Sequence, residues 1–402
     1  MGDLHLVGLG PRRTFTQRAH GGSTTPLPAA LTTIEALSSL RDLTPSLALW
    51  RRRDLLADQL TSAPALRDAA RVDDVDLWPI VEVDLRGAAT VQWPWSARSM
   101  DEAGAALAHL QPESIVTYAE AGGWGRALTL EARRRGVRSV GLQHGFIYRH
   151  WLNYCHDEDE FERRGEDHGC PIPDRTLLYD GFAEETLRTI GHYPADRLSV
   201  TGSPRLDGLA ARLAAATDEE RVATRRKTGV TRQEQRLVLL AAKFSEVRDD
   251  LPPLIAAVRS MPDVQLAIKA HPAEVAEVYA PLVRGVDNVV VLGAEADLAG
   301  LLDAADLVVT KNSTVALDGL ALGRPALVIG LPNNLSPFVE AGVMLGAGPE
   351  EIGSPLRAVL YDRETRTRLL EAAGAFCARY GVMARGNAAH ASAAAIVELD
   401  LN

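Results

Sequence analysis

Three neighbouring polar residues, Asn312, Ser313 and Thr314, have the chemistry of a phosphate site. They follow the apolar run DLVVT (306–310) and stand where a helix is predicted to begin. The backbone N–H groups of a first helical turn have no partner within the helix, so together with the side chains they can surround an anion. Because Asn and Ser are also common N-cap residues, the alternative is that Asn312 or Ser313 only caps this helix.

A second motif of this kind is KAHPAE, residues 269–274. His271 can donate a hydrogen bond to a phosphate oxygen, Lys269 can balance the charge, and Pro272 ends the strand. The alternative for His271 is an ordinary solvated loop residue. The recurrence of such motifs after neighbouring apolar runs favours a common phosphate site.

Two further loops supply candidates for the same site. Lys243 follows the run LVLLAA (237–242), and we expect it to bind phosphate. Ser203 and Arg205, in GSPRLD (202–207), could contact phosphate as well. The alternative is that this segment is a proline-stiffened hinge between domains.

The segment GLQHG (141–145) places unusual residues directly after a short apolar run. We expect His144 to act as a base, and Gln143 and Gly145 to lie on the acceptor or sugar side, where glycine allows close approach of the backbone. The alternative is a structural turn in which Gly145 has a positive φ.

Glu120 is the first candidate for the general base. It follows the run SIVTYA (114–119) and precedes Gly122 and Gly123, which we expect on the acceptor or sugar side. A base must come within hydrogen-bond reach of the proton that it removes. The alternative is that Glu120 is a helix N-terminal charge favoured by the helix dipole.

The elements that must position these residues are clearest from about residue 235 onward. Short, β-branched-rich apolar runs alternate there with helix-like segments; the runs are LVLLAA (237–242), VQLAIKA (264–270), NVVVL (288–292), DLVVT (306–310) and PALVIG (325–330). Strands buried on both faces and joined by helices predict a parallel sheet with right-handed crossovers. Residues 114–145 predict one βαβ unit of a similar domain. In such sheets, ligands bind at the carboxyl ends of the strands, so the loops that follow the runs should form the site.

The predicted fold class is therefore α/β, with two Rossmann-like, doubly wound domains that face each other across a cleft. We predict an N-terminal acceptor-side domain (1–207), a helical connection (208–234), a nucleotide-binding domain (235–380) and a C-terminal helix (381–402). A chain of 402 residues is long enough for two such domains.

Composition excludes several classes of function. The formal net charge of −10 argues against a nonspecific nucleic-acid binder, which needs a basic face. No apolar run is long enough to span a membrane, and three cysteines fit a reducing compartment. We therefore expect a cytoplasmic protein that does not bind nucleic acid.

We expect no metal and no cofactor. Asp74 and Asp76 form a short acidic pattern that arises easily by chance. A structural zinc site is an alternative for the segment 155–170, with the four ligands Cys155, His156, His168 and Cys170. Their spacing differs from that of usual zinc sites, so a solvated loop is the prediction.

The set GLQHG, TGSPRLD, KAHP and NSTVALDGLALGRPALVIG resembles bacterial capsule and surface-polysaccharide glycosyltransferases of the two-Rossmann GT-B type, and more broadly the nonhydrolysing UDP-N-acetylglucosamine 2-epimerase superfamily. The resemblance covers roughly residues 110–345. The pair His271-Pro272 with Ser313-Thr314 is similar to the His-Pro and Ser-Ser/Thr motifs of sialyl- and Kdo-transferases. This resemblance implies that both motifs hold the nucleotide and phosphate of a CMP-sugar, and that Glu120 matches the acidic motif that supplies the base.

The resemblance implies a glycosyltransferase that moves a sugar from a CMP- or UDP-linked donor, which is a substrate, to a glycan or glycolipid acceptor. The chain departs from the epimerase pattern, because STVALDG and GLQHG lack its paired acidic residues and its His-Val-Glu-Ala-Gly strand end. The alternatives are a sugar-nucleotide 2-epimerase, a CDP-glycerol-type glycerophosphotransferase, or a non-enzymatic nucleotide-binding subunit of a polysaccharide assembly complex. Peripheral contact with such machinery at the inner membrane face is part of the hypothesis, and the oligomeric state is left open.

Overall fold

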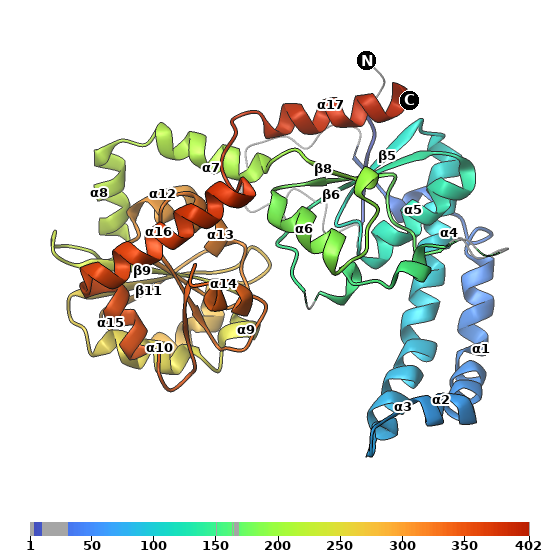
Figure 1. Ribbon diagram of the computed structural model, residues 1–402, viewed down its shortest axis with the longest axis horizontal. Coiled ribbons are helices and arrows are strands. Elements are labelled where there is room, and N and C mark those ends of the chain that lie inside the picture. Colours follow the sequence, from blue (N-terminus) through green and yellow to red (C-terminus); the bar gives the residue numbers. More distant parts are fainter. Residues whose placement is uncertain (1–3, 10–30, 150, 163, 165–168, 402) are drawn as a thin grey trace. The chain divides into compact units, whose positions relative to one another are not determined.

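The computed structural model describes residues 4–9, 31–149, 151–162, 164 and 169–401 (Figure 1). The chain folds into two compact units. The first comprises Met1–Leu142, Asp157–Thr176 and Leu399–Asn402, and the second comprises Gln143–His156 and Leu177–Glu398. The predicted domain boundaries at residues 207, 234 and 380 stay predictions beside this division.

The second unit contains a sheet of six parallel strands. The strands are β9 (Arg236–Ala241), β10 (Val264–Lys269), β11 (Val289–Leu292), β12 (Leu307–Thr310), β13 (Ala326–Ile329) and β14 (Leu345–Ala347). Their order is β11-β10-β9-β12-β13-β14, and all five neighbouring pairs are parallel. The first five strands confirm the five predicted runs, whereas β14 was not predicted. The order steps outward from β9 in both directions, which is the doubly wound arrangement.

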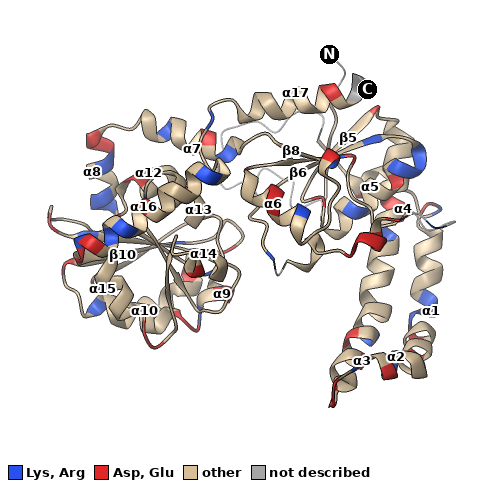
Figure 2. Ribbon diagram, in the orientation of Figure 1, with Lys and Arg blue, Asp and Glu red and all other residues tan. Residues whose placement is uncertain are grey.

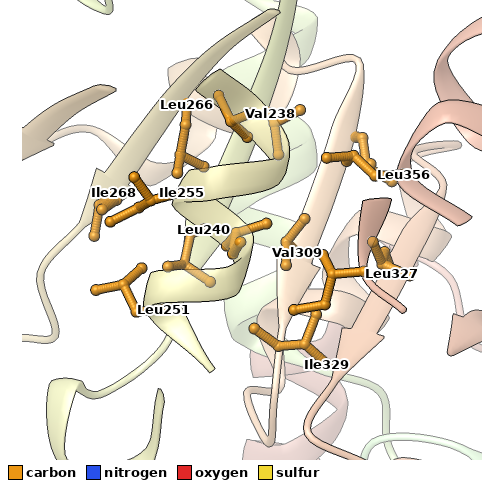
Figure 3. Packing of buried hydrophobic residues seen from close by; sticks show 14 of the residues in the cluster. Val238, Leu240, Leu251, Ile255, Leu266, Ile268, Val309, Leu327, Ile329 and Leu356 are labelled. Carbon is orange, nitrogen blue, oxygen red and sulfur yellow. The ribbon is translucent and has the colours of Figure 1, made fainter. Parts of the chain in front are cut away.

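Both faces of this sheet are buried, because successive side chains of a strand point to opposite faces. In β9, Val238 and Leu240 pack in a cluster with α10 (Leu251–Arg259) and α15 (Gly353–Tyr361), while Leu237 and Leu239 pack in a second cluster with α12 (Leu298–Ala304). All four side chains are at most 1% exposed. Figure 3 shows the first cluster, in which Leu251 and Ile255 of α10 and Leu356 of α15 cover β9, β10, β12 and β13. Burial on both faces explains why these strands are continuous apolar runs.

Helices make up most of the rest of the second unit. They are α6 (Gly181–Thr189), α7 (Pro204–Ala214), α8 (Asp218–Lys227), α9 (Phe244–Val247), α10 (Leu251–Arg259), α11 (Ala280–Val283), α12 (Leu298–Ala304), α13 (Val315–Ala321), α14 (Ser336–Glu340), α15 (Gly353–Tyr361), α16 (Arg363–Tyr380) and α17 (Ala388–Leu401), with the 3-10 turns η5 (Leu152–Tyr154), η7 (Ala195–Arg197) and η8 (Ala276–Tyr279). Of residues 208–234, most of the part up to Lys227 lies in α7 and α8, residues 228–234 lie in neither helix, and no strand falls in the segment.

The first unit contains the predicted βαβ unit. Strand β5 (Ser114–Tyr118) leads through a glycine-containing loop into α5 (Gly123–Arg135), and β6 (Arg138–Leu142) then pairs with β5 in parallel, Ser114 opposite Arg138. Strand β7 (Arg175–Leu178) and β8 (Leu198–Val200) continue this sheet in the order β5-β6-β7-β8, and the boundary between the two units falls within β7. The remaining short elements are β1 (Leu6–Gly8), β2 (Leu31–Thr33), η3 (Ile34–Leu37) and η6 (Glu158–Phe161).

A helical arm precedes this βαβ unit in the first unit (Figure 1). It consists of α1 (Thr44–Thr61), α2 (Pro64–Ala69), a two-stranded ribbon of β3 (Arg71–Val72) and β4 (Val75–Asp76), α3 (Trp78–Gly87), the π-helix η4 (Ala88–Gln92) and α4 (Trp93–Leu110). Helix α1 packs against α4, and the backbone N–H of Ser46 donates to Asp101 at 2.9 Å. Among the residues that the structure describes, no helix combines the length and the apolar character that crossing a bilayer requires.

Candidate nucleotide-binding site

A pocket of about 620 Å³ opens at the carboxyl ends of β9, β10 and β12, and every residue that lines it belongs to the second unit. The strand order reverses between β9 and β12, and ligands of doubly wound sheets bind at such a switch point. The pocket brings together ten predicted site residues: His144, Gly145, Arg205, Lys243, Lys269, His271, Pro272, Asn312, Ser313 and Thr314. Its lining carries three cationic side chains (Arg205, Lys243 and Lys269) and one carboxylate (Glu246), in a chain whose net charge is −10.

Lys269 ends β10 and is only 9% exposed. Its Nζ donates to the carbonyl oxygens of Ala270 at 3.3 Å and Ala294 at 3.0 Å. Burial lowers the pKa of Lys269, and nearby Glu295 opposes this shift. Because an ammonium group has three donors, one N–H can still bind an anion in the pocket.

His271 is held in a defined orientation by its own loop. The backbone N–H of Ala273 donates to Nδ1 of His271 at 3.1 Å, so the proton of the neutral ring is on Nε2. Burial lowers the pKa of His271, and the positive charge of Lys243 lowers it further. At neutral pH the ring is therefore a neutral N–H donor, suited to a phosphate oxygen.

The loop after β12 presents hydroxyl and amide groups to the pocket. The Oγ of Ser313 accepts the backbone N–H of Val315 at 3.3 Å and can still donate its own hydrogen. The Oδ1 of Asn312 accepts the backbone N–H of Asn334 at 3.3 Å, which ties this loop to the one after β13. Thr314 is the N-cap residue of α13 but makes no side-chain cap. Ser313 therefore both accepts a backbone N–H at the start of α13 and lines the pocket.

Arg205 connects two sequence motifs. Its Nη2 lies 2.9 Å and 2.7 Å from the two carboxylate oxygens of Asp318, whose side chain is 5% exposed. Burial raises the pKa of Asp318 to about 6, although Arg205 opposes the shift. Ser203 caps α7 by accepting the backbone N–H of Leu206, and it does not line this pocket. Asp318 was missed from the sequence, where nothing indicates its partner.

The segment after β6 is fixed by Gln143, which is 3% exposed. Its Oε1 accepts the backbone N–H of Tyr179 at 2.8 Å, and its Nε2 donates to the carbonyl oxygen of Gly145 at 2.8 Å. A Cβ atom at Gly145 would lie 4.0 Å from Oγ1 of Thr314, so this loop closely approaches the loop after β12. The amide of Gln143 thereby sets the position of its neighbour His144.

His144 lines the pocket, and its ring lies edge-on to Trp151 with ring centroids 5.3 Å apart. Burial lowers the pKa of His144, so the ring is neutral at neutral pH and can accept a proton. Trp151 also stacks on Tyr148 at 5.8 Å, and both aromatic rings line the pocket. Neither ring was predicted in the site.

Glu246 is the pocket carboxylate that sequence reasoning missed. It lies 3.8 Å from Nζ of Lys243, and its charge raises the pKa of Tyr148, for which burial is the larger cause. Glu246 follows β9 and Asn334 follows β13, so the general rule that ligands meet the carboxyl ends of strands pointed to both loops. The sequence offered no reason to choose these residues within the loops.

Glu120, Gly122 and Gly123 belong to the first unit. Glu120 is 1% exposed, and a Cβ atom at Gly141 would lie 2.7 Å from its Cγ, so the glycine makes room for this side chain. Gly122 is the N-cap residue of α5, and no atom lies within 4 Å of a Cβ placed at Gly123. The proposed base role of Glu120 stays a prediction.

In the described part of the chain, no group of three or more His, Cys, Asp or Glu side chains is placed to hold a metal ion. His168, one of the four residues of the alternative zinc site, lies outside the described residues. Cys170 is near Arg126, whose Nη1 donates to its Sγ at 2.8 Å, and Sγ of Cys155 donates to the carbonyl oxygen of Arg149.

Comparison with known proteins agrees with this architecture. Residues 232–334 match the family model described as capsule polysaccharide biosynthesis protein. No curated protein sequence is significantly similar to the chain. Three solved structures are similar in fold. They are a UDP-GlcNAc 2-epimerase from Neisseria meningitidis bound to UDP-GlcNAc (13% identity, TM-score 0.57, covering 76% of this chain and 82% of that one), the MnaA protein of S. aureus with UDP (14%, 0.51, 69% and 75%), and a glycosyltransferase from Rickettsia africae ESF-5 (10%, 0.50, 76% and 81%).

These similarities confirm the predicted fold class, an α/β architecture with two Rossmann-like domains of the GT-B type. The match to the family model also confirms the resemblance to capsule biosynthesis proteins. The segment matched by the family model contains the strand ends that carry Lys243, Lys269, His271, Ser313 and Thr314.

Proposed function

We propose that this chain is a glycosyltransferase that transfers a sugar from a nucleotide-linked donor to a surface-polysaccharide or glycolipid acceptor. The pocket of the second unit binds the nucleotide and phosphate of the donor. One observation carries the proposal: Lys269, His271 and Ser313, which suit an anion, line one pocket at the switch point of a doubly wound sheet. The match to the capsule biosynthesis family and the fold of a known glycosyltransferase support the same class.

The pocket residues would assist the departure of the nucleotide. When the bond between the sugar and the phosphate breaks, negative charge develops on the leaving phosphate oxygen. Lys269, the Nε2–H of His271 and the hydroxyl of Ser313 are already oriented by other hydrogen bonds, so they stabilise that charge with little reorganisation. No metal ion enters this scheme.

The acceptor hydroxyl must lose a proton as its oxygen attacks the anomeric carbon. His144 lines the pocket and is neutral at neutral pH, so it can take that proton. Glu120 is the other proposed base, on the strength of its match to the acidic motif of the transferase family. Action on a membrane-bound acceptor at the cytoplasmic face of the inner membrane is part of the same proposal.

Thermal unfolding against CMP, CDP, UDP and GDP tests the donor pocket. A ligand that binds only the folded state raises the melting temperature. At a concentration a hundredfold above Kd, it adds about 2.7 kcal/mol to the free energy of unfolding. We expect a shift with one nucleotide, and we expect His271→Ala and Ser313→Ala to reduce it. The matched controls are His390→Ala and Ser354→Ala, because both residues are exposed and neither lines the pocket.

The absence of a shift with every nucleotide would contradict the proposal. A shift that survives both pocket variants would place the nucleotide elsewhere. The epimerase alternative is tested with the UDP-sugar that binds: incorporation of solvent deuterium into the sugar without any acceptor would favour epimerisation over transfer.

A further inference from the structure

Exposed apolar side chains are concentrated on the helical arm of the first unit. Of the 22 large apolar side chains that are exposed in the described residues, 10 lie in the arm, within residues 44–95. They include Trp50 of α1, which is 48% exposed, and Trp95 of α4, which is 57% exposed. Scattered single exposures need no explanation, but a concentration on one element indicates a surface that meets an apolar partner.

Several of these side chains line one groove between α1 and α4. The groove has a volume of about 370 Å³, and its lining includes Leu47, Trp50, Val91, Trp95 and Arg98. Leu47 and Val91 are 44% and 57% exposed. We call this set the arm groove. Its walls are mostly apolar, with Ser46 and Arg98 as the polar lining residues, and both tryptophan rings are accessible from solvent.

Arginine side chains border the arm groove. The guanidinium group of Arg53 lies 4.3 Å from the ring centroid of Trp50, and that of Arg98 lies 5.1 Å from the ring centroid of Trp95. Arg51 and Arg52 are exposed on α1, where Figure 2 shows basic residues in blue. Nearby Glu102 is paired with Arg98, and Asp54 lies 3.6 Å from Arg53. The charges of Arg53 and Arg98 are therefore offset, and the positive charge beside the groove comes from Arg51 and Arg52, although the whole chain is acidic.

We propose that the arm groove docks the protein on a lipid bilayer that contains anionic lipids. Tryptophan rings partition to the boundary between headgroups and acyl chains, where their apolar faces are buried and their N–H groups stay solvated. The exposed guanidinium groups of Arg51 and Arg52 on α1 bind lipid phosphates and attract the anionic surface. The groove thus combines an apolar anchor with a charge that complements the membrane, the two signals that stable peripheral binding needs.

The charge also favours a bilayer over a second copy of this chain. A symmetric dimer through the arm groove would apply the same patch of both copies to each other, and would therefore bring two sets of Arg51, Arg52 and Arg53 together. Such like charges disfavour association. The acidic ribbon residues Asp73, Asp74 and Asp76 are exposed and would be repelled by the same lipids, so the groove and not the β3–β4 ribbon faces the membrane.

Vesicle co-sedimentation of the full chain tests this surface, independently of the donor pocket. We expect binding to vesicles of equal parts phosphatidylglycerol and phosphatidylcholine, and weaker binding to phosphatidylcholine alone. Trp50→Ala combined with Trp95→Ala should lower the partition coefficient at least about tenfold, because it removes the apolar anchor. Arg51→Gln combined with Arg52→Gln should lower it roughly fivefold for each arginine removed.

Two controls separate docking from general changes of the protein. Tyr118→Ala removes an aromatic ring that is 64% exposed on β5 of the same unit, and Arg67→Gln removes an exposed arginine of α2 outside the groove. Neither should change vesicle binding, and all variants should keep the circular dichroism of the parent chain.

Absence of binding to anionic vesicles would overturn the proposal, as would binding that the tryptophan substitutions leave unchanged. Light scattering gives a further outcome that would refute it: a dimer of the parent chain that these substitutions dissociate would show that a second copy covers the groove.

Discussion

The six-stranded sheet of the second unit and the helical arm of the first contain the same kinds of apolar residues in opposite environments. Leu237 and Leu240 of β9 are at most 1% exposed, whereas Leu47 and Leu55 of α1 are 44% and 53% exposed. Burial of a leucine contributes about 1.5–3 kcal/mol to folding, so the sheet residues stabilise the fold and the arm residues contribute far less. Apolar content alone therefore does not distinguish a core element from an interaction surface.

The two regions differ in their charges as well. In the second unit, buried carboxylates hold cations in place: Asp250 binds Lys311 at 2.7 Å, and Asp318 binds Arg205. In the arm, Arg53 and Arg98 lie over exposed tryptophan rings and are also paired, Arg53 with the exposed Asp54 and Arg98 with the buried Glu102. A paired, buried charge gives a site a fixed geometry. The exposed Arg51 and Arg52 of α1 are the arginines that remain accessible to a partner.

The largest effect is expected where a buried carboxylate would lose its partner. Asp250 is 4% exposed at its side chain, so Lys311→Met should lower the free energy of unfolding by about 3–5 kcal/mol. Urea unfolding followed by circular dichroism measures this change. Arg248→Met is the matched control, because Arg248 pairs with Asp249 on the surface and should change stability by less than about 1 kcal/mol. Equal effects of the two substitutions would show that Asp250 is not buried as the structure describes.

A cavity in the sheet should have the next largest effect. Leu240→Ala removes a side chain that is 1% exposed and packs against both strands and helices of its cluster. We expect a loss of about 2–5 kcal/mol, from the removed burial and the cavity left behind. The conservative variant Leu240→Met should lose less than about 1.5 kcal/mol. If Leu240→Ala changed the urea midpoint as little as an exposed substitution does, the contrast between sheet and arm would fail.

The comparison also explains which parts of the fold could be predicted. The five predicted strands of the second unit are buried on both faces, so each is a continuous apolar run between polar loops. Strand β14 is only three residues long and contains Gly346, so it has no such run. In the arm, exposed side chains such as Ile80 and Val83 blur the periodic pattern that would reveal a helix.

The sequence predicted which loops form the candidate site, but it did not predict which side chains in those loops contact each other. Ten predicted residues line the pocket because a parallel sheet brings the carboxyl ends of its strands to one edge. The pairing of Arg205 with Asp318 joins residues 113 positions apart, and no spacing rule encodes such a contact. Gln143 was predicted on the acceptor side, yet its amide is bonded to Tyr179 and Gly145. Which polar group binds backbone and which faces a ligand depends on tertiary structure.

Asp318 allows a smaller test, which depends on pH. Burial raises its pKa to about 6, above its ordinary value of 3.8, so the folded state holds the proton more tightly than the unfolded state. This contribution to stability is complete at low pH and is lost as pH rises through about 6. Asp318→Asn cannot lose a proton, so its stability relative to the parent chain should improve between pH 5 and pH 7, by on the order of 1 kcal/mol.

The difference between Asp318→Asn and the parent chain cancels the titration of other groups that the substitution leaves unchanged. The exposed variant Asp249→Asn serves as the control and should show no comparable trend. No trend between pH 5 and pH 7, with a pH-dependent difference only below about pH 4, would mean that Arg205 dominates the environment of Asp318 and lowers its pKa. The increase in stability that a bound nucleotide gives is measured for both proteins. A smaller increase for Asp318→Asn would show that the ion pair of Asp318 with Arg205 supports nucleotide binding.

The smallest effect is expected on the arm. Leu55 is 53% exposed on α1 and lies outside the arm groove, and alanine is the better helix former. Leu55→Ala should therefore change the free energy of unfolding by less than about 0.5 kcal/mol, with vesicle binding unchanged. The same leucine-to-alanine change is predicted to cost several-fold more in β9, so urea unfolding of both variants compares the two regions with identical chemistry. A loss that grows with protein concentration would reveal that another copy buries Leu55, and would show that the arm is a core element of an assembly.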